Sequence, residues 1–122
     1  MKKLVVGIAS KEALKKRSMA IAKGEYVPKR GEPKIWFSSL ESFAKVLSER
    51  NVELLNVIVE HQPKDYSELV KLSGRSKPSL SRTLRTMERY GLIELEEGEG
   101  QRIIPHALYT DVEVKYPLLP AH

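Results

Sequence analysis

Three arginines, Arg82, Arg85 and Arg89, recur at helical spacing within one short stretch of the chain. At 100° per residue they fall on one side of a helix. The opposite side carries the residues that would pack inward, Leu80, Thr83, Leu84 and Met87. A guanidinium group can bind guanine O6 and N7, or a phosphate, through two parallel hydrogen bonds. The pattern therefore predicts a helix that buries one face and offers the other to DNA.

Short hydroxyl side chains flank these arginines, namely Ser79, Ser81 and Thr86. Hydroxyl groups of this size allow close approach to backbone phosphates or to base edges. A solvated basic helix face is the plainer interpretation of the same residues. The turn before this helix and the hairpin predicted after it favour the DNA-binding interpretation.

Other kinds of chemistry find little support in the sequence. The absence of cysteine removes disulfides, thiolate metal sites and cysteine nucleophiles. His61, His106 and His122 are far apart and lack carboxylate pairs at ligand spacing, so we expect no metal site. No serine has a nucleophile-elbow context, and Gly98 and Gly100 precede no helix that could hold a phosphate. We expect a protein that is not an enzyme and has no cofactor.

The elements that would position the arginines have clear boundaries. Ser76 can cap the arginine-bearing helix from Lys77, Pro78 fits its first turn, and Gly91 stands where a helix commonly ends. A shorter helix precedes it, opened by the capping pair Asp65 and Glu68 and closed at Gly74. Two helices joined by a glycine turn predict a helix-turn-helix unit.

Beyond Gly91 the apolar period changes from helical to alternating. Leu92, Ile93 and Leu95 lead into an acidic, glycine-containing turn at 97–100, and 102–109 returns as a second strand. With the helix that begins near Asn51, residues 51–109 follow the order of a winged helix-turn-helix. We therefore predict an α+β fold, mainly helical, with a β-hairpin wing.

The chain upstream predicts a short extension. Residues 3–9 indicate a strand, and Ser10 can cap a helix over 11–23. Prolines mark a loop over 26–33, 35–37 predicts a short strand, and Ser38 with Glu41 has capping-box spacing. We expect three parts: an extension over 1–37, a winged helix-turn-helix domain over 38–109, and a strand and tail over 110–122.

Positive charge is concentrated in two blocks, although the net charge is only +5. Residues 1–34 carry ten Lys/Arg against three Glu, and residues 64–91 carry seven against three acidic residues. Such blocks suit a polyanion-binding surface, and they also keep small proteins soluble. The basic face of the first helix contains Lys11, Lys15, Lys16, Arg17 and Lys23. It is equally consistent with a solvated face, an additional phosphate contact or an anchor for an acidic partner.

The stretch DYSELVKLSGRSKPSLSRTLRTMERYGLIELEEGEGQRIIP resembles the DNA-binding core of MarR-type winged-helix regulators. The shared features are the capped helix, the glycine turn, the Ser/Thr/Arg helix with its LxxMExxGLI ending, and the wing. The resemblance implies that Arg102 is the basic wing residue near the minor groove. The full set expected to contact DNA is Arg75, Ser76, Lys77, Ser79, Ser81, Arg82, Arg85, Thr86, Arg89 and Arg102.

The wing departs from that family pattern. It carries Glu94, Glu96, Glu97 and Glu99, and only Arg102 offsets them. Carboxylates are unfavourable beside phosphates. We therefore expect either that Arg102 alone reaches DNA or that the acidic tip faces a protein partner.

The upstream stretch EPKIWFSSLESFAKVLSERNVELLNVI is similar to a subgroup of small predicted regulators, some of which are antitoxins. The expected function is sequence-specific binding of double-stranded DNA by a cytoplasmic homodimer, as a transcriptional regulator and autorepressor. The N-terminal strand and helix, and the C-terminal strand ending near Tyr116, flank the core and are the expected dimerisation elements. One alternative is an antitoxin that binds a toxin protein and represses its own operon. The other is a protein-binding winged helix without DNA affinity.

Two further expectations concern apolar residues. The apolar runs are too short for a membrane span of about 20 residues, so no membrane association is expected. Trp36, Phe37 and Phe43 are interpreted as core residues, with a small-ligand pocket as the alternative.

Overall fold

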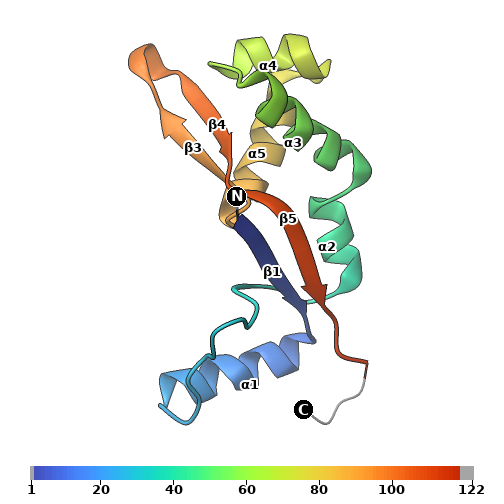
Figure 1. Ribbon diagram of the computed structural model, residues 1–122, viewed down its shortest axis with the longest axis vertical. Helices are drawn as coiled ribbons and strands as arrows, with labels where there is room; N and C mark the ends of the chain where they lie inside the picture. Colours follow the sequence, from blue (N-terminus) through green and yellow to red (C-terminus); the bar gives the residue numbers. More distant parts are fainter. Residues whose placement is uncertain (1, 119–122) are drawn as a thin grey trace.

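The computed structural model describes residues 2–118, which form an α+β fold with two small sheets (Figure 1). The elements in chain order are β1 (Lys2–Ile8), α1 (Lys11–Ala22), β2 (Ile35–Phe37), α2 (Leu40–Val46), α3 (Glu49–His61), α4 (Tyr66–Ser73), α5 (Lys77–Arg89), β3 (Ile93–Glu97), β4 (Ile103–Ala107) and β5 (Tyr109–Lys115). A short 3-10 turn, Glu99–Gln101, connects β3 to β4. None of the helices in this part of the chain has the length and apolar character needed to cross a lipid bilayer.

Strands from opposite ends of the chain meet in one parallel sheet with the order β2-β1-β5. In β1, Leu4, Val6 and Ile8 alternate toward the core and are almost completely buried. Both edges of β1 are paired within the chain, so this strand has no edge left for a second copy. Of the two strands expected to serve dimerisation, only β5 keeps a free edge.

The helices begin where side-chain oxygens accept otherwise unpaired backbone N–H groups. Ser48, Asp65 and Ser76 cap α3, α4 and α5 respectively. The expected cap of α2 was wrong by one residue, because Ser39 and not Ser38 accepts the N–H of Ser42, at 3.1 Å. β2 remains paired with β1 through Phe37, which delays the start of the helix.

One hydrophobic core joins the parallel sheet to the helices and the hairpin. Its buried members include Leu54 and Ile58 of α3, Leu69 of α4 and Leu84 of α5. Phe37 stacks on Tyr90, with ring centroids 4.4 Å apart, and meets Phe43 edge-on at 5.3 Å. The core assignment of Phe37 and Phe43 is therefore confirmed.

The core assignment of Trp36 is wrong, because this residue lies on the other side of the sheet, half-buried over Gly7. A Cβ at Gly7 would approach the indole ring to 2.4 Å, so only glycine leaves room for this ring. The guanidinium of Arg17 lies 5.2 Å from the Trp36 ring centroid and 5.4 Å from that of Tyr26. This cluster holds α1, none of whose residues is buried, and α1 projects from the body in Figure 1.

The connection from α5 to the hairpin follows a Schellman motif. Gly91 has φ +75°, its N–H donates to Glu88 O, and the N–H of Leu92 donates to Met87 O. β3 and β4 then pair antiparallel, with Leu95 opposite Pro105. The predicted helix end and hairpin are confirmed.

Candidate nucleic-acid interface

Helix α5 is fixed in place by its apolar face. Leu80, Leu84 and Met87 are fully buried, while Arg82, Arg85 and Arg89 on the other face are exposed. Ser76 caps the first turn through the N–H of Ser79, and the preceding turn reverses at Gly74 with φ +73°. The helix therefore presents its arginines from a packed and capped element.

Two hollows border the exposed face of α5. The first, here called the hairpin-side hollow, has a volume of about 310 Å³ and lies between α4, α5 and the hairpin turn. It brings together four of the expected contact residues: Lys77, Ser81, Arg85 and Arg102. Arg85 Nε donates to Ser81 Oγ at 3.4 Å. A cation from the hairpin thus shares one concave surface with two cations from α5.

The second hollow, here called the α2-side hollow, has a volume of about 330 Å³ and lies on the other flank of α5. It contains three further expected contact residues, Ser79, Arg82 and Thr86. Thr86 Oγ1 donates to Arg82 O at 3.0 Å, so this hydroxyl is turned toward its own helix. Lys45 and Asn51 also line it, and sequence reasoning did not select either residue.

The remaining expected residues have other surroundings. Arg75 donates to Asn51 Oδ1 at 3.0 Å and to Arg50 O at 2.6 Å, which ties the α4–α5 turn to the start of α3. Burial lowers the pKa of Arg75, and the nearby Arg50 acts in the same direction. The Ser76 hydroxyl serves as the α5 cap, and Arg89 is exposed on the last turn, outside both hollows.

Tyr66, the first residue of α4, is a further candidate that sequence reasoning missed. It lines the hairpin-side hollow and is 7% exposed, and its hydroxyl has no hydrogen-bond partner among residues 2–118. Burial raises the pKa of Tyr66, whereas the positive charge of Arg85 acts in the opposite direction. A buried donor without a partner is costly, so a bound acceptor such as a phosphate oxygen would relieve that cost. The sequence shows only an aromatic residue at a helix start, where packing is the simplest role.

Two of the hairpin glutamates lie on the face of the hairpin that is opposite its packed side chains. Glu94 pairs in register with His106 and Glu96 with Ile104, while Leu95 and Ile103 on the opposite face pack against the core. Glu96 Oε2 lies 3.0 Å from His106 Nε2. Two of the four hairpin glutamates are thereby directed away from the face that packs toward α5.

Metal binding has no support in the described part of the chain. Within residues 2–118 no three His, Asp or Glu side chains gather closely enough to hold a metal ion. His61 lies in the last turn of α3 and His106 in β4, while His122 lies outside the described residues.

Comparison with protein-family models gives a match to HVO_A0114 over residues 46–114, more than half of the chain. The match spans α3, α4, α5, the hairpin and most of β5. This α+β chain therefore belongs to the HVO_A0114 family. Neither the curated proteins nor the solved structures provide a match.

Proposed function

We propose that this protein binds double-stranded DNA with sequence specificity and acts as a transcriptional regulator that represses its own operon. In this proposal α4 and α5 form the helix-turn-helix, and β3 and β4 form the wing. Helix α5 would enter the major groove, which admits one α-helix and offers a different donor and acceptor pattern for each base pair.

One observation carries the proposal: Lys77, Ser81 and Arg85 of α5 line the same hollow as Arg102 of the hairpin. Arg102 comes from a different element than the three α5 residues, and their convergence gives a concave surface beside an exposed arginine face, lined by three cations and one carboxylate residue, Asp65. A duplex fits such a surface because α5 can read base edges while the flanking cations bind phosphates on either side.

The positions of Glu94 and Glu96 are compatible with this arrangement. Because Glu94 and Glu96 alternate away from the packed hairpin face, Arg102 can approach a phosphate without bringing these two carboxylates with it. We therefore favour the prediction that Arg102 alone carries the hairpin contact.

The experiment measures fluorescence anisotropy of labelled duplexes, one from the intergenic DNA upstream of the gene and one with the same bases scrambled. Arg82→Ala combined with Arg85→Ala should weaken binding to the upstream duplex by about 1–3 kcal/mol for each lost base contact. It should also reduce the difference between the two duplexes, because the remaining cations bind phosphates without regard to sequence.

A matched control removes two exposed cations elsewhere, through Lys29→Ala combined with Arg30→Ala in the loop after α1. This control should keep most of the discrimination between the duplexes. If the α5 double variant retained wild-type affinity for both duplexes, the assignment of α5 as the reading helix would be wrong.

A further inference from the structure

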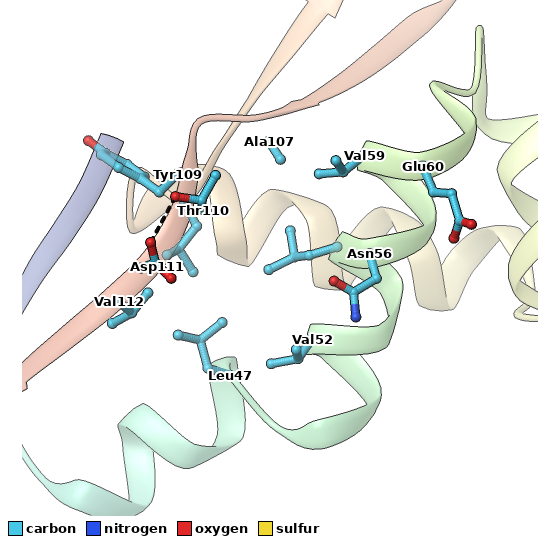
Figure 2. A pocket seen from close by; sticks show the side chains of 12 residues that line it. Leu47, Val52, Asn56, Val59, Glu60, Ala107, Tyr109, Thr110, Asp111 and Val112 are labelled. Carbon is cyan, nitrogen blue, oxygen red and sulfur yellow. Dashed lines mark hydrogen bonds between the residues drawn. The ribbon is translucent and has the colours of Figure 1, made fainter. Parts of the chain in front are cut away.

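Strand β5 has one free edge, and an apolar groove runs beside it. β5 pairs only with β1, and no backbone hydrogen bond joins its other edge within residues 2–118. The groove has a volume of about 620 Å³, and Figure 2 shows β5 on one side of it and α3 on the other. The apolar wall is formed by Leu47, Val52, Leu55 and Val59.

The free edge of β5 itself faces this groove. Four consecutive residues at its start, 109–112, line it. Because successive strand residues point to opposite faces of a sheet, a cavity lined by an unbroken run must lie along the edge of the strand. Val52 and Val59 across the groove are 43% and 47% exposed. An exposed strand edge beside exposed apolar side chains is a template for pairing with another strand.

We propose that the groove binds a second copy of this chain, whose β5 pairs antiparallel with this β5 about a two-fold axis at Glu113. An isologous contact of this kind places the same surface on both subunits. It would join the two parallel sheets of the monomers into one continuous sheet. Antiparallel pairing also keeps the apolar faces of both copies on the same side.

The charges of β5 are complementary to themselves in this register. Asp111 faces Lys115 of the second copy, and by symmetry Lys115 faces the second Asp111, while the valines at 112 and 114 face one another. In the isolated chain Lys115 Nζ donates to Gly31 O at 3.1 Å, so the pairing exchanges this contact with a carbonyl for one with the Asp111 carboxylate. Glu113 meets its own symmetry mate. Its charge is offset by Lys3, whose Nζ lies 2.6 Å from the carboxylate.

Neighbouring registers fit less well. An axis at Val112 would place Asp111 opposite Glu113 of the second copy, a like-charge pair that destabilises a sheet. An axis at Val114 would pair only the last three residues of β5 with strand residues of the other copy, because β5 ends at Lys115. The axis at Glu113 combines favourable charges with a longer paired segment.

The same register would place the exposed apolar residues that follow β5 in the groove of the other copy. Tyr116 of the second copy would lie opposite Thr110, and Leu118 opposite Leu108, along the direction of the groove. Tyr116 and Leu118 are 50% and 87% exposed in the isolated chain. Their burial against Val52 and Val59 would remove apolar surface from water on both partners.

The inference deepens the proposed function, because a dimer would bring two α5 helices to one operator. Only this role of the dimer rests on the proposed function. Regulators of the helix-turn-helix type read two half-sites about one helical turn apart. The pairing itself involves no DNA, so it is tested without DNA.

The experiment uses sedimentation velocity on the full chain and on two charge-swap variants. Asp111→Lys places two lysines opposite each other at both symmetric positions, and Lys115→Asp places two aspartates there. Each single variant should raise the dimer dissociation constant by about tenfold or more. An equimolar mixture of the two should regain dimerisation, because both pairs between positions 111 and 115 in the mixed dimer are then oppositely charged.

Both positions are exposed, so the variants should fold, and circular dichroism with thermal melting checks this. Val114→Glu, at a position that is 39% exposed, gives a second variant and should also produce monomers. A monomeric wild-type chain at high micromolar concentration would overturn the pairing. The pairing would also be overturned by single charge-swap variants that dimerise like the wild type, or by a mixture of the two variants that stays monomeric.

These outcomes are separate from the test of DNA binding. A dimer that recovers in the mixture but binds no duplex would overturn the proposed function and leave the β5 pairing intact. A monomer that discriminates between the duplexes would overturn the β5 pairing and leave the proposed function intact.

Discussion

Helices α1 and α5 have almost the same length and the same charge, yet they are attached to the protein in opposite ways. Each carries four cationic side chains and one glutamate over 12 and 13 residues respectively, and each is capped by a serine. α5 buries Leu80, Leu84 and Met87 completely, whereas α1 buries none of its residues. α1 is instead held through Arg17, which lies over two aromatic rings.

The comparison shows that charge alone does not make a reading helix. Reading base edges requires side chains that are held in a fixed position relative to the groove, and packing supplies that position. Attraction to phosphates needs only positive charge near the duplex. α5 meets both conditions and α1 meets the second, so α1 remains equally consistent with a solvated face, a phosphate contact or an anchor for an acidic partner.

The largest expected effect tests this difference in attachment. Leu84→Ala removes a fully buried side chain and leaves a cavity, so it should lower the free energy of unfolding by about 2–5 kcal/mol. Met19→Ala in α1, at a residue that is 47% exposed, should change it by about 0.5 kcal/mol or less. Urea denaturation followed by circular dichroism measures both. Equal losses in the two variants would show that α1 is packed as firmly as α5.

A smaller effect compares two tyrosines that stand beside these helices. The Tyr26 hydroxyl near α1 donates to Glu32 Oε1, whereas the Tyr66 hydroxyl near α5 has no partner in the described part of the chain. Tyr66→Phe should raise the stability of the free protein by about 1 kcal/mol, because it removes a buried polar group that is not hydrogen-bonded. If that hydroxyl binds a phosphate oxygen, the same variant should weaken DNA binding by about threefold to tenfold.

The matched variant Tyr26→Phe loses a hydrogen bond that is formed in the free protein, so its stability should fall and its DNA affinity should stay close to wild type. Thermal melting and anisotropy on the same preparations give both quantities. A Tyr66→Phe variant that is less stable than wild type would mean that its hydroxyl already has a partner.

The helices and the hairpin could be predicted because their signals are local. Asp65 and Ser76 lie directly before apolar stripes, and Gly74 and Gly91 occupy the left-handed positions that end the two helices. Caps and left-handed glycines depend on neighbouring residues, so one sequence is enough to find them. The misplaced cap at Ser38 shows the limit, since pairing of β2 with β1 determines where α2 begins.

Contacts between distant segments could not be predicted in the same way. The pairing of β1 with β5 joins the two ends of the chain, and strand alternation alone does not specify a partner. The link from Arg75 to Asn51 and the position of Tyr66 in the hairpin-side hollow depend on how α3, α4 and α5 pack. Arg102 was expected from a family resemblance, and its place beside Arg85 depends on the direction of the hairpin.

The smallest expected effect concerns the attachment of α1 and its dependence on pH. Glu32 accepts hydrogen bonds from the Tyr26 hydroxyl and the Lys29 N–H, and its carboxylate lies 3.6 Å from Arg17. The bond from Tyr26 is the main cause that lowers the pKa of Glu32 below its ordinary value of 4.5, and the Lys29 N–H and Arg17 act in the same direction. A lowered folded-state pKa means that the carboxylate stabilises the cluster above pH 4.5 and loses this effect as the pH falls through the folded value.

Trp36 is the single tryptophan of the chain and lies under the Arg17 guanidinium, so its fluorescence reports on this cluster. Wild-type emission should change only at a pH below 4.5, as protonated Glu32 releases Tyr26 and Arg17. Glu32→Gln should show the altered emission already at pH 7 and lose that acidic transition, whereas Glu25→Gln in the same loop should behave as wild type. An unchanged acidic transition in Glu32→Gln would assign it to another group. The aromatic contacts of Arg17 would then be sufficient to hold the cluster around Trp36 when Glu32 has lost its charge.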